Sequence, residues 1–308
     1  MGSALVRRLR AGGYSNLLLH DRSETDLTDQ RSVRSLFAKE RPRYVVLAAA
    51  KVGGILANSR YPADFIVQNL MIQTNVIHES YRTGVNRLLF LGSSCIYPRL
   101  APQPLKEEYL LTGPLESTNR PYALAKIAGI EMCWSYNRQY ATQFLAAMPT
   151  NLYGPGDHYD LNDSHVIPGL IRKMHEAKST GAQEVVIWGT GTPQREFLDS
   201  DTAADACIFL LNLPDPQMRQ LTEDQEVAPM VNIGCGHDVT IAELARLIAE
   251  VVGFSGRLVF DNSKPDGTPR KLLDIGRLGR LGWFPPSPDS LRDGLRKAYR
   301  DFCEKVGH

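Results

Sequence analysis

The chain has 308 residues, of which 43% are hydrophobic and 22% are charged, and its formal net charge at pH 7 is +1. These values are ordinary for a globular protein and leave room for one large domain or two smaller ones. A net charge near zero argues against a nucleic-acid or membrane surface as the main partner, although a few arginines could still bind an anionic small molecule. No segment approaches the ~20 continuous apolar residues of a membrane span, and no charged segment leads into an apolar stretch as in a secretion signal.

The five cysteines are scattered along the chain and show no C-x-x-C spacing. This usage is typical of reduced thiols and predicts a cytoplasmic protein without a disulfide framework or a zinc site. The histidines other than His165 show no spacing of metal ligands, so we expect no bound metal.

The first half of the chain alternates short apolar runs with amphipathic ones, which is typical of a parallel α/β sheet. In chain order we expect helices over residues 1–11, 32–39, 65–81 and 122–140, and strands over 16–20, 44–50, 87–92 and 144–148. The strands over 44–50 and 87–92 are continuous apolar runs, which predicts burial on both faces.

A βαβ protein should not begin with its first helix. We therefore expect the first strand and most of the glycine-rich nucleotide loop to be missing at the N-terminus, with Gly2 as the last glycine of a G-x-x-G-x-x-G turn. A start downstream of the true one is the preferred explanation. Arg22, just beyond the second expected strand, stands where a cation would meet an adenosine 2′-phosphate, while Asp21 beside it is the opposing hint.

Longer loops follow after Pro149, and the segment from Tyr153 to Asp157 marks a domain boundary. Beyond it we expect strands over 184–188 and 257–260 and helices over 201–211, 240–252 and 289–303. Asp201 is the expected N-cap of the first helix, and Thr240 opens the second with capping-box spacing. The whole predicts a Rossmann-type doubly wound parallel sheet with a smaller α/β substrate-binding lobe. The expected boundaries are 1–152 with a return segment of about 196–216 for the dinucleotide domain, and 153–195 with 217–308 for the lobe.

Tyr122 and Lys126 are four residues apart and therefore share one face of the expected helix. A tyrosine hydroxyl normally titrates near pH 10, and an adjacent ammonium favours the phenolate, so the pair can donate a proton to a developing alkoxide. Taken alone, this spacing is more typical of an exposed pair on a helix than of a catalytic pair. The pair follows a buried strand that ends in Gly92-Ser93-Ser94, at a distance suited to a loop and the start of a helix. Ser93 could therefore hydrogen-bond the carbonyl oxygen that Tyr122 protonates, which favours hydride transfer to a ketone.

Cys95 and His165 add a second chemistry. A ketone acidifies the C–H bonds on both neighbouring carbons, and inverting such a carbon needs a base on one face and an acid on the other. A thiolate and an imidazole suit this task because both can titrate near neutral pH. The alternative is a buried structural cysteine and a hydrogen-bonded loop histidine.

Three cations could converge on a diphosphate, namely Lys173, Arg195 and Lys271, and Trp188 could stack on a base or a sugar. Each of them, taken singly, is also compatible with a surface charge or a core aromatic.

The chain resembles the extended short-chain dehydrogenase/reductase family over essentially its whole length. The resemblance rests on the strings at 47–55, 92–98, 121–129, 148–154, 164–168, 188–197 and 264–274. The Y-x-x-x-K spacing marks only the superfamily, whereas the cysteine within the serine motif and the S-H-V-I-P string at 164–168 mark one subfamily.

That resemblance implies conversion of GDP-4-keto-6-deoxy-D-mannose to GDP-L-fucose by a homodimeric enzyme. Cys95 and His165 would carry the 3,5-epimerisation, and NADPH would reduce the 4-ketone. Tyr122 would donate the proton, Lys126 would lower its pKa and Ser93 would orient the carbonyl. The GDP diphosphate would be held by Lys173, Arg195 and Lys271, with Trp188 nearby; the lysine at 173 stands where the family usually has arginine. The residues implied to contact NADP are Gly2, Arg22, Leu91, Gly92, Ser93, Ser94, Lys126, Pro149, Thr150, Asn151, Leu152 and His165.

Two alternatives stay open. Another nucleotide-sugar enzyme of the same fold, a 4-epimerase or 4,6-dehydratase, would use tightly held NAD; a dehydratase would carry an acidic pair where Cys95 and Ile96 stand. The chain could also be a non-catalytic binding protein that kept the pocket and lost the cofactor loop.

Overall fold

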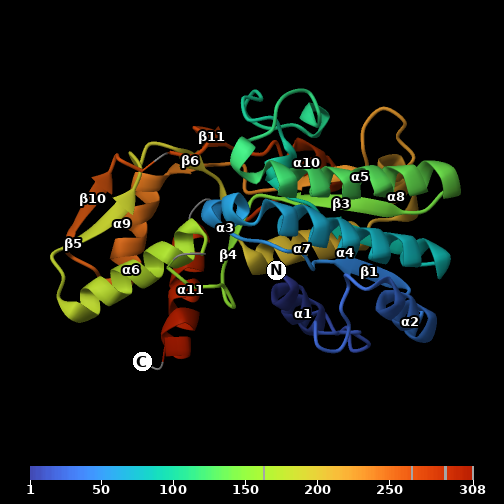
Figure 1. Ribbon diagram of the computed structural model, residues 1–308, viewed down its shortest axis with the longest axis horizontal. Helices are drawn as coiled ribbons and strands as arrows, with labels where there is room; N and C mark the ends of the chain where they lie inside the picture. The colour runs from blue at the N-terminus through green and yellow to red at the C-terminus, as the bar shows by residue number, and fades with distance from the viewer. Residues whose placement is uncertain (162–163, 265, 288–289, 307–308) are drawn as a thin grey trace.

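The computed structural model describes residues 1–161, 164–264, 266–287 and 290–306, and Figure 1 shows how its elements are arranged. The helices are α1 (Gly2–Ala11), α2 (Gln30–Glu40), α3 (Ile55–Arg60), α4 (Pro62–Arg82), α5 (Arg120–Tyr140), α6 (Val166–Thr180), α7 (Ser200–Leu211), α8 (Asp215–Thr222), α9 (Ile241–Val252), α10 (Gly276–Leu281) and α11 (Ser290–Val306), with short 3₁₀ turns η1 (Ser94–Ile96), η2 (Glu107–Tyr109) and η3 (Ser117–Asn119). The strands are β1 (Tyr44–Leu47), β2 (Arg87–Leu91), β3 (Phe144–Pro149), β4 (Asn151–Tyr153), β5 (Glu184–Trp188), β6 (Gln194–Arg195), β7 (Phe197–Asp199), β8 (Met230–Ile233), β9 (Val239–Thr240), β10 (Arg257–Asp261) and β11 (Arg270–Lys271).

The main sheet is parallel, with the strand order β1-β2-β3-β8. Alternate side chains of a strand point to opposite faces of the sheet. When helices cover both faces, each strand therefore needs apolar side chains on both of them. In β2, Leu89 and Leu91 join a core cluster with α1, α7, α8 and α10, whereas Leu88 and Phe90 join a second cluster with α2, α4 and α5. The sheet is therefore doubly wound, and the predicted fold class is confirmed.

A third core cluster forms a smaller lobe, which Figure 1 shows at the far end of the molecule from α2. It contains the paired strands β5 and β10 and the helices α6, α9 and α11. A three-stranded sheet of order β11-β6-β9 and the pair β4–β7 complete the strand pairings. The expected domain boundaries stay a prediction, and β8, from the segment expected in the lobe, is the fourth strand of the main sheet.

One predicted strand is wrong. Residues 14–20 form no strand, and Leu18 and Leu19 are about half exposed, at 50% and 49%. A strand is stable only with a hydrogen-bonded neighbour. The strand that follows this segment in the chain is β1, and β1 pairs with β2 instead. The strand predicted over 44–50 ends at Leu47 and is not buried on both faces, because β1 is an edge strand of the described sheet.

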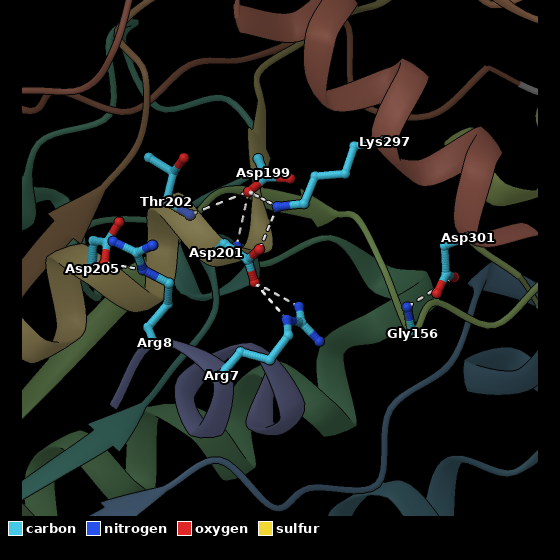
Figure 2. A network of polar contacts seen from close by, with 9 residues as sticks. All are labelled: Arg7, Arg8, Gly156, Asp199, Asp201, Thr202, Asp205, Lys297 and Asp301. Atoms are coloured by element: carbon cyan, nitrogen blue, oxygen red, sulfur yellow. Dashed lines mark hydrogen bonds and ion pairs between the residues drawn. The ribbon is translucent and has the colours of Figure 1, made fainter. Parts of the chain in front are cut away.

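The predicted N-cap of α7 is also wrong by two residues. Asp199 caps this helix by accepting hydrogen bonds from the backbone N–H groups of Asp201 and Thr202. Asp201 instead binds Arg7 of α1 and Lys297 of α11, as Figure 2 shows. A single carboxylate thus ties three helices together. The capping box at Thr240, in contrast, is confirmed, with both reciprocal hydrogen bonds to Glu243.

Glu196 lies between β6 and β7 and is the most constrained carboxylate near the small sheet. Its side chain is fully buried, and its oxygens accept hydrogen bonds from the backbone N–H groups of Cys235, Gly236 and Leu273 at 2.7, 2.8 and 3.0 Å. A Cβ atom at Gly234 would overlap the same carboxylate, so the loop after β8 is fitted tightly around it. Burial raises the pKa of Glu196, and the three N–H donors oppose this effect.

We predict that Glu196→Gln lowers the free energy of unfolding by about 1–3 kcal/mol, because an amide would turn its NH₂ group toward one of these buried N–H donors. Urea denaturation at pH 7 measures the loss. The matched control is Glu184→Gln, which removes an exposed ion pair with Arg257 and should change stability by less than ~0.5 kcal/mol. Equal losses in the two variants would contradict the role given to Glu196.

Candidate active site

The residues expected at the reacting centre meet at the carboxyl end of β2. Gly92 follows this strand, and a Cβ atom there would overlap the end of the Met148 side chain, which would have to move. Lys126 on α5 is buried and its Nζ donates to the carbonyl oxygen of Leu91 at 2.7 Å. The same Nζ lies 5.7 Å from the ring centroid of Tyr122. The hydroxyl of Ser93 lies near enough to Tyr122 to lower the pKa of its phenol, so the structure brings the predicted serine, tyrosine and lysine together.

The electrostatics of this group differ from the prediction. Burial raises the pKa of Tyr122, the charge of a Cys95 thiolate would raise it further, and Ser93 opposes both effects. Lys126 is not among the groups that shift this pKa, so the predicted lowering by its charge is not found. Burial also lowers the pKa of Lys126 to about 8. At neutral pH the tyrosine thus carries its proton and is ready to donate it.

Cys95 lies in η1, and its backbone N–H hydrogen-bonds to the side-chain oxygen of Ser93 at 3.4 Å. The thiol is buried, and burial raises its pKa, an effect opposed chiefly by the charge of Lys271 and by Ser93 and Lys126. Burial thus works against the thiolate that the sequence leads us to expect near neutral pH. Cys95 and Lys271 line a cavity of about 30 Å³ together with Asn119.

His165 lies elsewhere. It is exposed and occupies the N-cap position of α6, where its side chain makes no capping hydrogen bond. Its charge lowers the pKa of Asp157, which burial raises. The lining of the Cys95 cavity, as far as the chain is described, does not include His165. The joint action of Cys95 and His165 stays a prediction.

The segment implied to lie along the cofactor runs from β3 into β4. The backbone N–H of Thr150 donates to the carbonyl of Ile233 at 2.9 Å, and the side chains of Thr150 and Asn151 both donate to the backbone carbonyl of Glu196, at 3.2 and 2.9 Å. Pro149 ends β3 and Leu152 lies in β4, so both are fixed by strand pairing. Ser94 is buried in η1 beside Cys95.

Gly2 and Arg22 belong to the N-terminal part of the chain. Gly2 is the first residue of α1, and a Cβ atom there would meet nothing within 4 Å. Arg22 is exposed, with a 3.8 Å ion pair to Asp26. Asp21 makes short hydrogen bonds to Ser23 and so caps its own turn.

The cations expected at the diphosphate form two groups. Lys173 lies 5.3 Å from the ring centroid of Trp188, which is 54% exposed. Arg195 is the strand partner of Lys271 in the parallel pair β6–β11. Burial lowers the pKa of both Lys173 and Arg195, because each charge is partly removed from water.

Sequence reasoning missed three residues. Glu196 stands inside a string that was noted for Arg195, yet its burial depends on contacts with distant segments. Asn119 lines the Cys95 cavity, and its buried Oδ1 has no hydrogen-bond partner among the described residues. Lys264 lies 5.7 Å from the ring centroid of Trp188 and, unlike Lys173, follows this tryptophan in the sequence. For Asn119, the one local signal in the sequence was its position three residues before Tyr122.

In the described part of the chain, none of the helices combines the length and the apolar character of a membrane span. The same residues contain no group of three or more His, Cys, Asp or Glu side chains placed to hold a metal ion.

Comparison with known proteins gives consistent results. Residues 1–224 match the NAD dependent epimerase/dehydratase family. The chain is 56% identical over 306 residues to "Putative GDP-L-fucose synthase 2" of Arabidopsis thaliana, covering 99% of this chain and 89% of that protein. It is 54% identical to GDP-L-fucose synthase of Escherichia coli strain K12, with 99% and 94% covered. The crystal structure of a GDP-mannoheptose C4 reductase from Campylobacter jejuni with NADP bound is 41% identical, with a TM-score of 0.88 and 98% and 94% covered. The chain therefore belongs to the NAD dependent epimerase/dehydratase family, and its relatives there include the GDP-L-fucose synthases.

Proposed function

We propose that this protein converts GDP-4-keto-6-deoxy-D-mannose to GDP-L-fucose by 3,5-epimerisation followed by NADPH-dependent reduction of the 4-ketone. The observation that carries the proposal is the meeting of Ser93, Tyr122 and Lys126 with Cys95 at the end of β2. Curated GDP-L-fucose synthases that are 54–56% identical over 99% of the chain support the same reaction and substrate. Cys95 at this position favours it over a dehydratase.

The residues present fit the nicotinamide end of NADP. The Nζ of Lys126 has three N–H donors, and one hydrogen bond, to the carbonyl of Leu91, is found among the described residues. The remaining donors suit the hydroxyls of a ribose. Gly2 at the N-terminus of α1 has open space around it, which suits a pyrophosphate, and the exposed Arg22 suits a 2′-phosphate. The nicotinamide ring would be lined by Pro149, Thr150, Asn151 and Leu152. Its other neighbours would be Leu91, Gly92, Ser94 and His165.

Reduction of the 4-ketone needs a proton on oxygen as a hydride reaches C4. NADPH, when bound, supplies that hydride. The hydroxyl of Tyr122, protonated at neutral pH because burial raises its pKa, gives its proton to the developing alkoxide. Ser93 orients the carbonyl oxygen by hydrogen bonding, and the charge of Lys126 stabilises the phenolate that remains.

Epimerisation uses the acidity of the carbons on either side of the ketone. The Cys95 thiolate removes a proton from C3 or C5, the electron pair delocalises onto the 4-oxygen, and His165 returns a proton to the opposite face. Lys173 and Arg195 bind the GDP diphosphate, assisted by the charge of Lys271, and Trp188 packs against the nucleotide.

We also propose a cytoplasmic homodimer. The five cysteines are free thiols, which suits a reducing compartment. Val67 and Met71 on α4 and Leu124 on the adjacent α5 are exposed apolar side chains, at 50%, 44% and 39%. Apolar side chains on neighbouring long helices suit a helical interface between two copies.

We predict that Tyr122→Phe slows NADPH oxidation by about 10²–10⁴-fold while Cys95-dependent exchange of substrate protons with deuterated water continues. The phenyl ring keeps the packing against Phe65 but cannot donate a proton. NADPH absorbance measures the reduction, and mass spectrometry of the nucleotide sugar without NADPH measures the exchange. Cys95→Ser should lose the exchange. A wild-type protein that binds NADPH and the substrate but catalyses neither step would refute the proposed function.

We predict that Met71→Arg converts the dimer to a monomer, because a charge would be buried at the helical interface. Light scattering after size-exclusion chromatography measures the mass. Phe284→Arg is the matched control, since Phe284 is 73% exposed and lies outside α4 and α5. An unchanged mass for Met71→Arg would place the interface elsewhere.

A further inference from the structure

Asn119 is a polar side chain beside the proposed base that the reaction described above does not use. It lines the same cavity as Cys95, and its side-chain oxygen Oδ1 is shielded from solvent without a hydrogen-bond partner among the described residues. We propose that Asn119 is a specificity-determining residue, whose amide binds the hydroxyl group on C3 of the sugar. This inference rests on the proposed function, because it names a group by which that site recognises its substrate.

The position of Asn119 is set by the start of α5. Asn119 is the N-cap residue of this helix, and Tyr122 follows within the first turn. An asparagine at an N-cap usually accepts a hydrogen bond from a backbone N–H of that turn. Here the side chain makes no such bond to the described helix, and Pro121 has no N–H to offer. The amide oxygen is therefore not used by the helix that carries the proton donor.

A buried oxygen without a partner destabilises a fold by about 1–3 kcal/mol, so each one calls for a reason. Such atoms are few in the described part of the chain, and Asn119 is the one among them that lines the Cys95 cavity. A ligand that donates a hydrogen bond to Oδ1 would remove this penalty on binding. The orphaned oxygen thus favours a ligand group that carries a donor.

Other polar side chains of the cavity already have partners. Arg99 forms an ion pair with Glu116 at 3.2 Å, and both of them line the cavity. Arg270, which also lines it, forms an ion pair with Asp238 at 2.6 Å. The oxygen of Asn119 has no comparable partner among the described residues. Asn119 is therefore better placed than these ion-paired groups to bind an uncharged polar group of a ligand.

The size and polarity of the cavity indicate which kind of group enters it. Its volume of about 30 Å³ suits a group of about the size of one water molecule, so a substituent of the sugar fits but the ring does not. A methyl group of similar size would leave the surrounding polar atoms without partners. A hydroxyl group both donates and accepts hydrogen bonds, as an asparagine amide does. The cavity therefore favours a hydroxyl over a methyl group.

The proposed base then selects the hydroxyl. In the proposed reaction Cys95 removes a proton from C3 or C5 of the sugar. C3 carries a hydroxyl group, whereas C5 carries the ring oxygen and a methyl group. A hydroxyl that enters the cavity lined by Cys95 is therefore the one on C3. Its O–H donates to Oδ1 of Asn119 and its oxygen accepts from the Nδ2 group, which orients the sugar relative to the base.

The test is a cycle of two proteins and two substrates. The wild type and Asn119→Leu are each assayed with GDP-4-keto-6-deoxy-D-mannose and with its analogue that lacks the 3-hydroxyl group. We expect Asn119→Leu to lower kcat/KM for NADPH oxidation by about 10–100-fold with the first substrate, because one polar partner is removed. With the analogue the two proteins should differ less than about twofold, since the contact is already missing.

Two controls separate recognition from a structural role. Asn119→Leu should not lower the thermal unfolding midpoint, because it removes an oxygen that has no partner among the described residues. Asn212→Leu is the matched control and should leave the ratio of the two substrates unchanged. Asn212 is an exposed residue at the C-cap of α7, and its side chain donates to the carbonyl of Ile208.

The outcomes distinguish this inference from the proposed function. Equal losses with both substrates, or no loss with either, would overturn the role of Asn119. If the wild type does not oxidise NADPH with the first substrate, the proposed function has failed. The same cycle is then measured as binding of the two nucleotide sugars by calorimetry. A loss of affinity confined to the hydroxylated sugar still supports recognition by Asn119, and equal or absent effects overturn it.

Discussion

The carboxylate of Glu196 is the constraint on which the rest of the site depends. Three backbone N–H groups from two distant segments converge on it, and the backbone carbonyl of the same residue receives the side chains of Thr150 and Asn151. Left unpaired, each of these buried polar groups would destabilise the fold by about 1–3 kcal/mol. One residue thus fixes the loop after β8, the strand β11 and the β3–β4 junction relative to one another.

This arrangement explains why two chemistries can share one site. The reduction group stands on β2 and α5 of the main sheet, whereas Lys271 and Arg195 stand on the small sheet of β11, β6 and β9. Cys95 lies at the seam between them. In the proposed reaction the proton removed and the hydride accepted belong to neighbouring carbons of one sugar, so the two sheets must keep a fixed relative position. The hydrogen bonds of Glu196 hold the loop after β8 and the segment after β11 in place.

The parts of this site that the sequence predicted are those set by local spacing. Tyr122 and Lys126 share a face because four residues make one helical turn, and the capping box at Thr240 depends on its own next three residues. The failures are non-local. Residues 16–20 have the composition of a strand but lack a hydrogen-bonded neighbour, and the burial of Glu196 is decided by segments far along the chain. The neutral state of Tyr122 follows from desolvation, which no spacing reveals.

Lys126 shows what the site costs in stability. Its pKa falls from 10.5 to about 8 on burial, a difference equivalent to roughly 3 kcal/mol as an upper bound. Because the folded state holds this proton less tightly than the unfolded state, the penalty is present in full below pH 8 and fades as the pH rises toward 10.5. A core leucine would avoid it. Under the proposed function, ribose hydroxyls would accept the N–H donors of Lys126 that the described residues leave without a partner, so that cofactor binding would return stability that folding alone does not recover.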